Sequence, residues 1–549
     1  MQLEDITSLD IEDIRKSIIG EGAAIPGPFG PRSLVYADYV ASGRSLGFIE
    51  DAIRAHVMPF YGNTHTETSF TGRRSTQLRE MARNAVRKAV DADENHAVIF
   101  AGSGSTGAVD KLVRALSLKG FGKEAVVFVG PYEHHSNDLP WRESGAKIVR
   151  IPLNEHGTMC LDSLEAALIE HRDVSKKIGA VSAASNVTGV RTNIREVARI
   201  LHKYDAWAVV DYAAAAPYIP VRLAETSPGA GDRIDAAFIS AHKYPGGPGA
   251  SGLLICDHDL LHSARPTVAG GGTVSYVTAT RHNYVSDPER REEAGTPSII
   301  ENIRAGMVLQ LKHEMDEERV EKLEMARTGQ MEIGLRKIGR VELLGPVHAP
   351  RIGIFSFNIR AGQRFLHHNY VVALLNDLFG IQARGGCSCA GPYGHSLLRI
   401  DTELTNRHEA AVEQGHSAFR PGWARLGVNW FFSEDDVDNI VSAVQFIAQH
   451  GFELLPLYRL DLASGVWRAT AKVDDAPPET LSKLWCQDLA HKALDVPDFK
   501  TSLAEAERIV RKAGDLANVG LMELSPEEET LRWFWLPHEA GGNCSEDVA

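Results

Sequence analysis

From about residue 97 to residue 256, short apolar runs alternate with amphipathic segments of helix length. The predicted strands are 97–101, 125–129, 147–151, 178–182, 207–211, 234–239 and 251–256, and the helices predicted between them are 105–119, 161–172 and 193–204. Strands that alternate with helices form a mostly parallel sheet that helices cover on both faces. The sequence therefore predicts a doubly wound α/β domain.

The rest of the chain is arranged around this unit. A long helical pattern at 300–339 leads out of the large domain, and strands at 352–358 and 424–431 precede a closing helix at 435–449. A last helix is expected at 501–514. We expect an N-terminal arm at 1–35, a large domain at 36–305, a smaller C-terminal α/β domain at 306–455 and an extension of unknown role at 456–549.

The balance of charges argues against two classes of partner. The 58 lysines and arginines are outnumbered by 72 aspartates and glutamates, so the formal net charge is −14. An acidic surface repels phosphate backbones and anionic lipids, so we expect neither nucleic acid nor a membrane as a partner. The sequence starts without the basic and apolar regions of a signal peptide, and six cysteines are too few for a disulfide framework. A cytoplasmic enzyme is the expected class.

Polar residues follow five of the predicted strands. They are Gly102–Gly107, Glu133–Asn137, Ser185 with Asn186, Asp211, and Ser240–Lys243. Ligands of open parallel sheets bind just beyond the carboxyl ends of the strands. Because those ends share one edge of the sheet, we expect these side chains to converge on one crevice.

The glycine-rich turn Gly102–Gly107 is typical of an anion site, because small residues let backbone N–H groups and a helix start approach a phosphate. The turn also fits the Gly-x-Gly-x-x-Gly pattern of dinucleotide-binding folds, so a nicotinamide-dependent oxidoreductase is an alternative. The acid that binds ribose in those folds is missing, because Phe128–Pro131 stands at the end of the next strand. A helix-opening turn that binds no ligand is the remaining alternative.

Lys243 brings a primary amine to the crevice. A lysine before a Gly/Pro-rich turn is more often exposed to solvent, but Ser240 and His242 stand beside this one, and Asp211 faces the same crevice. An amine, a carboxylate and a phosphate cradle together suit pyridoxal 5'-phosphate (PLP). The amine forms a Schiff base with that cofactor, and the carboxylate keeps its pyridine nitrogen protonated.

Ten short motifs, in sequence order, carry a resemblance to a known family. They are Tyr36–Asp38, Tyr61–Asn63, Glu133–Asn137, Pro140–Trp141, Ser185–Gly189, Asp211–Pro217, Ser240–Lys243, Gly270–Gly272, Glu293–Pro297 and Arg384–Ala390. Through them the chain resembles, over about residues 35–450, the class V aminotransferase group of fold-type I PLP enzymes, and most closely its cysteine desulfurase and selenocysteine lyase branch. The resemblance implies a large doubly wound domain with a smaller C-terminal α/β domain, assembled as a homodimer.

The resemblance also implies roles for individual residues. Lys243 would hold the cofactor and move the Cα proton, Asp211 would pair with the pyridinium nitrogen, and His134 would stack on the ring. The other implied contacts are Gly104, Ser105, Ser240 and His242 to the phosphate, Asn186 to the cofactor or substrate, Thr296 to the phosphate of the neighbouring subunit, and Arg384 and Arg425 to the substrate carboxylate. Taken alone, each arginine is more often part of a surface ion pair.

Cys389 aligns with the nucleophile of the desulfurase branch. In the mechanism that this implies, its thiolate attacks the sulfur of a substrate cysteine, which leaves a persulfide on Cys389 and alanine as the product. A protein that accepts the sulfur would then be a partner. Two departures from the family pattern stand out, since Cys387 and Ser388 replace two histidines and Ala214 replaces a glutamine.

The Cys387 and Cys389 pair leaves several interpretations open. It is a nucleophile with a resolving thiol, a pair that passes sulfur along, a purely structural pair or half of a metal site. A structural zinc site needs four ligands and His395 would supply only a third, so we predict no metal site.

The predicted function is a PLP-dependent enzyme that acts on a small amino acid, as a cysteine desulfurase or a selenocysteine lyase. A class V aminotransferase or epimerase in which Cys389 is not the nucleophile is an alternative that uses the same lysine, aspartate and arginines. A non-catalytic scaffold that binds a sulfur carrier is a third, against which the intact Lys243 and Asp211 argue.

Overall fold

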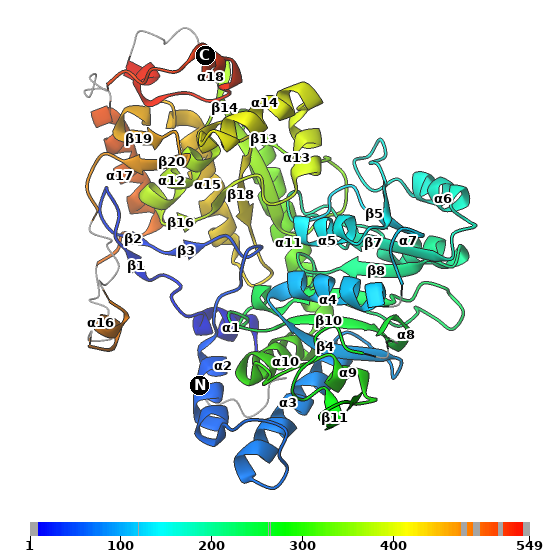
Figure 1. Ribbon diagram of the computed structural model, residues 1–549. Coiled ribbons are helices and arrows are strands. Elements are labelled where there is room, and N and C mark those ends of the chain that lie inside the picture. Colours follow the sequence, from blue (N-terminus) through cyan, green and yellow to red (C-terminus); the bar gives the residue numbers. More distant parts are fainter. Residues whose placement is uncertain are drawn as a thin grey trace.

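The computed structural model describes residues 9–118, 120–261, 263, 265–473, 480–486, 495–513 and 520–541. Residues 1–8 of the predicted arm lie outside these ranges, as do residue 514 of the helix expected at 501–514 and other parts of the predicted extension. The described chain forms a large domain built on one sheet and a smaller domain built on a second (Figure 1).

A seven-stranded sheet forms the centre of the large domain. Its strands, in spatial order, are β4 (His96–Gly102), β10 (Gly252–Asp257), β9 (Ala236–Ser240), β8 (Trp207–Asp211), β7 (Lys176–Ser182), β5 (Ala125–Val129) and β6 (Lys147–Arg150). β10 runs antiparallel to both of its neighbours, and every other neighbouring pair is parallel. The predicted α/β class and the positions of the predicted strands are confirmed.

Helices cover both faces of this sheet, as continuous apolar strands require. Successive strand residues point to opposite faces, so Val98 packs into one core and Ile99 into the other. One face is covered by α4 (Gly104–Leu118), α5 (Leu139–Glu143) and α8 (His258–Leu261), and the other by α3 (Phe70–Ala89), α6 (Leu161–Glu170), α7 (Ile194–Lys203) and α10 (Ile299–Glu314).

The helical pattern predicted at 300–339 is two helices, not one. α10 ends at Glu314, and α11 (Glu317–Arg336) begins after Asp316, whose carboxylate accepts a hydrogen bond from Arg319 N at 3.1 Å. An N-cap aspartate satisfies an amide that the start of a helix leaves without a partner, so it stabilises a new helix start at this position. The apolar periodicity alone does not show this break.

The smaller domain is built on an antiparallel sheet. Its strands are β13 (Val341–Leu343), β14 (Ile354–Ala361), β18 (Trp423–Gly427) and β17 (Arg384–Gly386) in spatial order, with β15 (Arg364–Leu366) also paired to β14. The helices of this domain are α12 (His368–Phe379), α13 (Gly391–Leu398), α14 (Thr402–Glu413) and α15 (Glu434–His450). β18 ends at Gly427, so the strand expected to reach residue 431 is shorter than predicted.

The N-terminal segment lies against both domains. It contains α1 (Ile11–Ser17), β1 (Ala24–Ile25), β2 (Arg32–Ser33) and β3 (Val35–Tyr36), and α2 (Gly47–Ala52) follows it. β3 pairs in parallel with β16 (Ile381–Gln382) of the smaller domain, while Gly43 N donates to the carbonyl of His242 at 2.9 Å. The buried Arg32 pairs with Glu505 at 3.0 Å. The segment expected as an extended arm is therefore built into the fold.

Most of the described part of the extension packs on the smaller domain, while α16 lies apart from it (Figure 1). Its elements are β19 (Tyr458–Asp461), β20 (Val466–Ala469), α16 (Leu481–Cys486), α17 (Phe499–Ala513) and α18 (Pro526–Leu531). The Trp533 ring stacks on His367, with ring centroids 5.2 Å apart, and Trp535 Nε1 donates to the carbonyl of Ala361 at 2.7 Å. Aromatic burial of this kind ties the end of the chain to the small-domain sheet.

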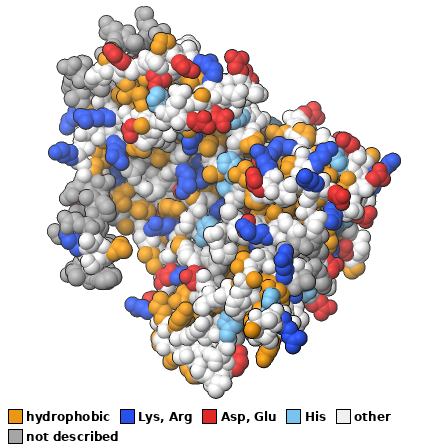
Figure 2. Space-filling model, viewed as in Figure 1, with side chains coloured by type: hydrophobic (Ala, Val, Ile, Leu, Met, Phe, Trp, Pro, Cys, Tyr) orange, Lys and Arg blue, Asp and Glu red, His pale blue; other side chains and the backbone are white. Residues whose placement is uncertain are grey.

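Two observations concern the outside of the molecule. Among the described residues, no helix is both long enough and apolar enough to cross a membrane. On the face seen in Figure 2, basic and acidic side chains are interspersed, without the broad basic area that tracks a phosphate backbone.

Candidate active site

A cavity of about 230 Å³ lies at the carboxyl ends of the central strands. Loops that follow five strands of the large sheet form one wall, and residues of the smaller domain form the other. The predicted site residues that line it are Gly104, Ser105, His134, Asn186, Asp211, Ser240, His242, Lys243, Arg384, Cys389 and Arg425. The structure thus brings together side chains that lie up to 321 positions apart in sequence, from Gly104 to Arg425.

Thr296 is the predicted site residue that lies outside this cavity. It is exposed and lines a neighbouring cavity of about 220 Å³. Asn63 Nδ2 donates to its Oγ1 at 3.3 Å, which places two of the sequence motifs in contact. Within one chain, Thr296 therefore has no access to the central cavity.

Lys243 and Asp211 come from neighbouring strands of the sheet. Asp211 is the last residue of β8, and Lys243 ends the short turn that follows β9. Burial lowers the pKa of the Lys243 amine to about 8, although the Asp211 carboxylate opposes that shift. Burial raises the pKa of Asp211, whose Oδ1 accepts a hydrogen bond from Ala213 N at 2.8 Å. The cavity therefore holds an amine that deprotonates readily beside a buried carboxylate.

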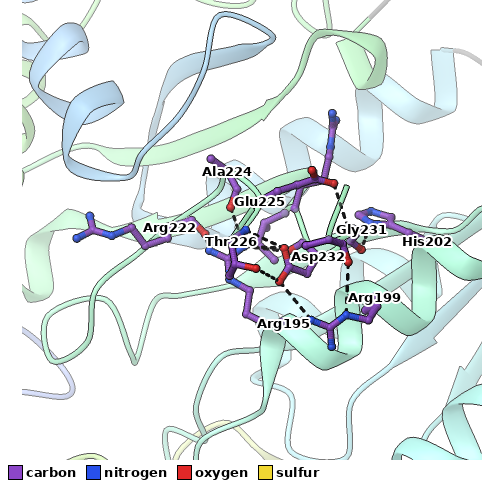
Figure 3. Close-up of polar contacts among 12 residues, drawn as sticks. Arg195, Arg199, His202, Arg222, Ala224, Glu225, Thr226, Gly231 and Asp232 are labelled. Carbon is purple, nitrogen blue, oxygen red and sulfur yellow. Dashed lines mark hydrogen bonds and ion pairs between the residues drawn. The ribbon is translucent and has the colours of Figure 1, made fainter. Parts of the chain in front are cut away.

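The connection between β8 and β9 is held by a polar network (Figure 3). Arg195 Nη1 donates to the carbonyls of Ala224 and Asp232, each at 2.8 Å. The Asp232 side chain in turn accepts from the Thr226 hydroxyl at 2.7 Å and pairs with Arg199 at 3.4 Å. This network fixes the segment that joins Asp211, at the end of β8, to β9, the strand that Lys243 follows.

Gly104 opens α4 with a φ of +60°, a left-handed conformation that favours glycine. A Cβ at this position would lie 2.9 Å from His242 Cε1 and 3.2 Å from Ser240 Oγ. Ser105 N donates to Ser240 Oγ at 3.0 Å. Burial and the charge of Lys243 lower the pKa of His242 to about 4, so its ring is neutral near pH 7. Backbone amides, a hydroxyl and a neutral imidazole therefore surround the helix start, an arrangement that suits an anion.

His134 stands on the cavity wall as a neutral ring. Burial is the main cause that lowers its pKa to about 4, and the positive charge of Lys243 adds to it. His134 Nδ1 accepts a hydrogen bond from Ser136 N at 3.1 Å, so the proton of the neutral ring is on Nε2. The neighbouring Glu133 is buried and holds the end of β7, because its carboxylate accepts from both the amide (2.8 Å) and the hydroxyl (2.6 Å) of Ser182.

Arg384 and Arg425 lie opposite each other on β17 and β18. Both pair with one carboxylate, since Arg384 Nε lies 3.0 Å from Asp38 Oδ2 and Arg425 Nη2 lies 3.1 Å from Asp38 Oδ1. Arg425 is buried and Arg384 is 56% exposed at its side chain. Arg425 Nη1 also donates to the carbonyl of Asn186 at 3.1 Å. Two guanidinium groups are thus aimed at one edge of the cavity.

Asp38 is the residue of this site to which sequence reasoning gave no role. Its motif, Tyr36–Asp38, is part of the family resemblance, but nothing in the local sequence indicates a partner more than 340 positions away. The signal available is an acid that directly follows a short apolar strand, since Asp38 is buried just beyond β3.

The loop that carries Cys389 is tied to the large-domain wall. Asn186 Nδ2 donates to the carbonyl of Ser388 at 2.7 Å, and His135 N donates to the carbonyl of Cys389 at 2.9 Å. Trp423 Nε1 donates to the Ser388 hydroxyl at 3.2 Å. The Cys389 side chain is exposed at the cavity, while the Oδ1 atom of Asn186 is buried without a hydrogen-bond partner.

In the part of the chain that the structure describes, no three or more His, Cys, Asp or Glu side chains are gathered as a metal ion would require. Cys387 and Cys389 are both free thiols there.

Comparisons with known proteins identify the family and the fold. The profile of the family "Aminotransferase class-V" matches residues 35–439. A protein named "Probable cysteine desulfurase" from Halalkalibacterium halodurans is 27% identical over 65% of this chain and 84% of its own length. A "Cysteine desulfurase" from Dickeya dadantii is 25% identical over 75% of this chain and 92% of its own length. Among solved structures, the apo cysteine desulfurase from Thermococcus onnurineus superposes with a TM-score of 0.66 at 23% identity, covering 80% of this chain and 99% of that one.

Proposed function

The chain belongs to the aminotransferase class-V family, and from this premise we propose that it is a PLP-dependent cysteine desulfurase that converts a cysteine to alanine. The observation that carries the proposal is the cavity itself. It joins the amine of Lys243 and the carboxylate of Asp211 to an exposed thiol, Cys389, and to two arginines. Relatives at 25% and 27% identity that bear the name cysteine desulfurase support it.

The residues present fit PLP. The start of α4 has the space that only glycine leaves at position 104, beside Ser240 and the neutral His242, and these groups would hold the phosphate. The buried Oδ1 of Asn186 has no partner within the protein, which fits an acceptor reserved for a bound donor. Asp211 would pair with the pyridine nitrogen, and Lys243 would form the covalent link. Ala214 lines the cavity and offers no side-chain hydrogen bond.

When bound, PLP withdraws electrons from the α-carbon of an amino acid and makes its proton acidic. The protein supplies the base. With its pKa lowered to about 8, the Lys243 amine is partly neutral near pH 7 and can accept that proton and return it. His134, neutral at the same pH, would cover the cofactor ring without adding a charge.

Arg384 and Arg425 would bind the substrate carboxylate. A planar guanidinium forms two parallel hydrogen bonds to a carboxylate, so the pair fixes the orientation of the substrate as well as its charge. Asp38 holds both guanidinium groups in place, because each of its oxygens takes one of them. The substrate sulfur would then point toward the Cys389 side of the cavity.

Cys389 would take up the sulfur. Its thiolate would attack the substrate sulfur, so that a sulfur–sulfur bond forms and the bond between that sulfur and the substrate β-carbon breaks. The electron pair of the broken bond goes to the β-carbon, which takes up a proton to become the methyl group of alanine. The hydrogen bonds from Asn186 and His135 to the loop hold the thiol at the cavity. A protein that accepts this sulfur follows as a partner.

We further propose that two chains associate as a homodimer. Exposed apolar side chains lie close in sequence to Asn63, which contacts Thr296: Phe60, Tyr61 and Phe70 are 43%, 48% and 56% exposed, and the Phe60 and Phe70 rings are in contact. Tyr276 in strand β11 (Val274–Val277), which pairs with β12 (His282–Tyr284), is 68% exposed. Apolar surface of this kind is typical of an interface, and association there would let Thr296 reach the partner's site.

Free thiols and the absence of disulfides among the described cysteines favour a cytoplasmic location.

Product analysis tests the proposal. The purified enzyme with PLP is given L-cysteine and a thiol reductant, and we expect alanine and sulfide in equal amounts. Bound PLP with neither product would contradict desulfuration and would favour transamination or epimerisation. The Cys160→Ser variant is the matched control, because Cys160 is a free thiol remote from the cavity and its loss should change neither yield.

A further inference from the structure

Cys387 lies two residues before the proposed nucleophile, and the proposed reaction leaves it without a role. It is a free, half-buried thiol, while Cys389 is free and exposed. Ser388 between them has a φ of 53°, which lies in the left-handed helical region. In a helical backbone of either hand, Cα atoms two residues apart are about 5.4 Å from each other, as the helix radius, rise and turn require. Disulfide-bonded cysteines have Cα separations of about 4.4 to 6.8 Å, so the two Cα atoms lie in that range. Side chains two residues apart in such a backbone point to different sides, so a bond between the thiols requires the Cys387 side of the loop to turn.

The backbone at this pair is strained and is held in place from outside. Ser388 and Cys389 are consecutive non-glycine residues with positive φ, 53° and 54°, a conformation that L side chains disfavour. Hydrogen bonds from Asn186, His135 and Trp423 to these two residues offset that strain. Strain that the surroundings maintain in this way is a feature of functional sites rather than of ordinary loops.

The two thiols differ in how firmly they are held. Cys389 is fixed through its carbonyl and through its neighbour Ser388. Cys387 follows Gly386, which has a φ of 125° and no atom within 4 Å of the place where a Cβ would stand. Gly386 is the last residue of β17, and the Cys387 carbonyl accepts only a long hydrogen bond, 3.4 Å, from Ala390 N. Rotation of the backbone beyond the strand can therefore turn the Cys387 thiol toward Cys389, while the hydrogen bonds to Ser388 and Cys389 hold the rest of the loop.

We propose that Cys387 is the resolving thiol of this enzyme and that it releases the sulfur from Cys389 as free sulfide when no acceptor protein takes that sulfur. The inference rests on the proposed desulfuration, which places a persulfide on Cys389. The Cys387 thiolate attacks the Cys389 sulfur that is bonded to the protein, and a Cys387–Cys389 disulfide forms. The bond to the outer sulfur breaks, and that sulfur leaves with the electron pair and takes up a proton as hydrosulfide.

The step is balanced without an outside oxidant. A persulfide and a thiol give a disulfide and hydrogen sulfide, because the outer sulfur accepts the two electrons that the new disulfide gives up. The enzyme then stays in the disulfide form until a dithiol reductant restores both thiols. Each site therefore releases one sulfide and then stops when no reductant is present.

Mass analysis of one peptide tests this assignment. Cleavage after Arg384 and Arg399 yields a peptide that contains both cysteines. The PLP-loaded enzyme is given one equivalent of L-cysteine per site without reductant and is quenched in acid. For the wild type we expect one alanine and one sulfide per site, with the peptide lighter by two hydrogen atoms. For Cys387→Ser we expect the same alanine, at least a tenfold loss of sulfide, and a peptide heavier by one sulfur atom.

The possible failures can be told apart. If no alanine forms in either protein, the proposed function is wrong. If alanine forms and the wild-type peptide keeps the extra sulfur as fully as the Cys387→Ser peptide does, the resolving role is wrong and the desulfuration stands. The alanine yield also reports whether the variant folds. Cys160→Ser, which should behave as the wild type, controls for the loss of a thiol elsewhere.

Discussion

The two walls of the active-site cavity are built in different ways. On the large-domain wall, short loops at the ends of neighbouring strands place Asp211 and Lys243, and a dense polar network holds the segment between them. On the small-domain wall, Arg384 and Arg425 depend on Asp38, and Cys389 depends on hydrogen bonds from the opposite wall. The first wall is fixed by its own strands and suits holding a cofactor. The second is fixed by contacts between distant segments and suits binding and release.

Loss of the lysine is expected to have the largest effect. In Lys243→Ala the cavity has no amine to form the covalent link or to move the Cα proton, so turnover should fall at least about 10³-fold. Turnover with L-cysteine and the visible absorbance of the bound cofactor measure this. Lys312→Ala is not a suitable control, because Lys312 is half-buried and donates to the carbonyls of Ala216 and Ile219. Lys322, on the exposed face of α11, is the better control. If Lys243→Ala keeps its absorbance and rate, the assignment of the large-domain wall is wrong.

A change at Asp38 tests the other wall. In Asp38→Asn the shared carboxylate loses its charge, so both guanidinium groups lose their anchor and the substrate shifts. Misplacement by about 1 Å can cost about 100-fold, and we expect kcat/KM to fall about 10- to 100-fold, mainly through KM. Asp38→Glu keeps the charge and should recover part of the loss. An unchanged KM in Asp38→Asn would show that the arginines do not need this carboxylate.

A substitution at Gly104 separates backbone strain from the shape of the cradle. In Gly104→Ala the new Cβ would lie 2.9 Å from His242 Cε1 at a φ of +60°. We expect PLP affinity, measured by titration of the apoenzyme, to fall about tenfold, the equivalent of about 1.4 kcal/mol. Gly102→Ala is the matched control, because Gly102 also has a positive φ, +72°, but open space at its Cβ. Equal losses in both variants would mean that strain alone, and not the cradle, is responsible.

The last expected effect is on stability, not on turnover or binding, and it concerns pH and the small-domain side. Burial under Trp533 and its neighbours lowers the pKa of His367 to about 3 in the folded state, against about 6.5 when unfolded. The unfolded chain therefore binds the extra proton between these values, and stability is lost as the pH falls below about 6.5, by about 1.4 kcal/mol per pH unit from this group. Urea unfolding at pH 7 and pH 5 measures the loss. His367→Phe should reduce the slope, and an unchanged slope would contradict this origin.

The sequence predicts the large-domain wall well because parallel strands follow simple rules. The apolar run 207–211 ends in Asp211, and the strand ends of a parallel sheet share one edge, so the sequence alone places Lys243 and Gly104 near it. Features that depend on distant or capping contacts were not predicted. They include the break before α11 at Asp316 and the bridge from Asp38 to two arginines.

The small-domain side shows the same limit. The packing of Trp533 on His367 joins segments more than 160 positions apart, and no local pattern indicates it. The left-handed conformation of Ser388 likewise comes from hydrogen bonds that Asn186 and Trp423 supply, not from the propensity of serine. The Cys-x-Cys motif is visible in the sequence, but its backbone geometry is not.

The most direct test of the account separates the two walls in one variant, Cys389→Ala. The account predicts that this variant binds PLP and shows the spectral change of the wild type when L-cysteine is added, with a saturation constant within about twofold of the wild type, while alanine formation stops. Alanine formed at the wild-type rate in Cys389→Ala would contradict the central claim that the large-domain wall activates the substrate and the Cys389 thiol removes its sulfur.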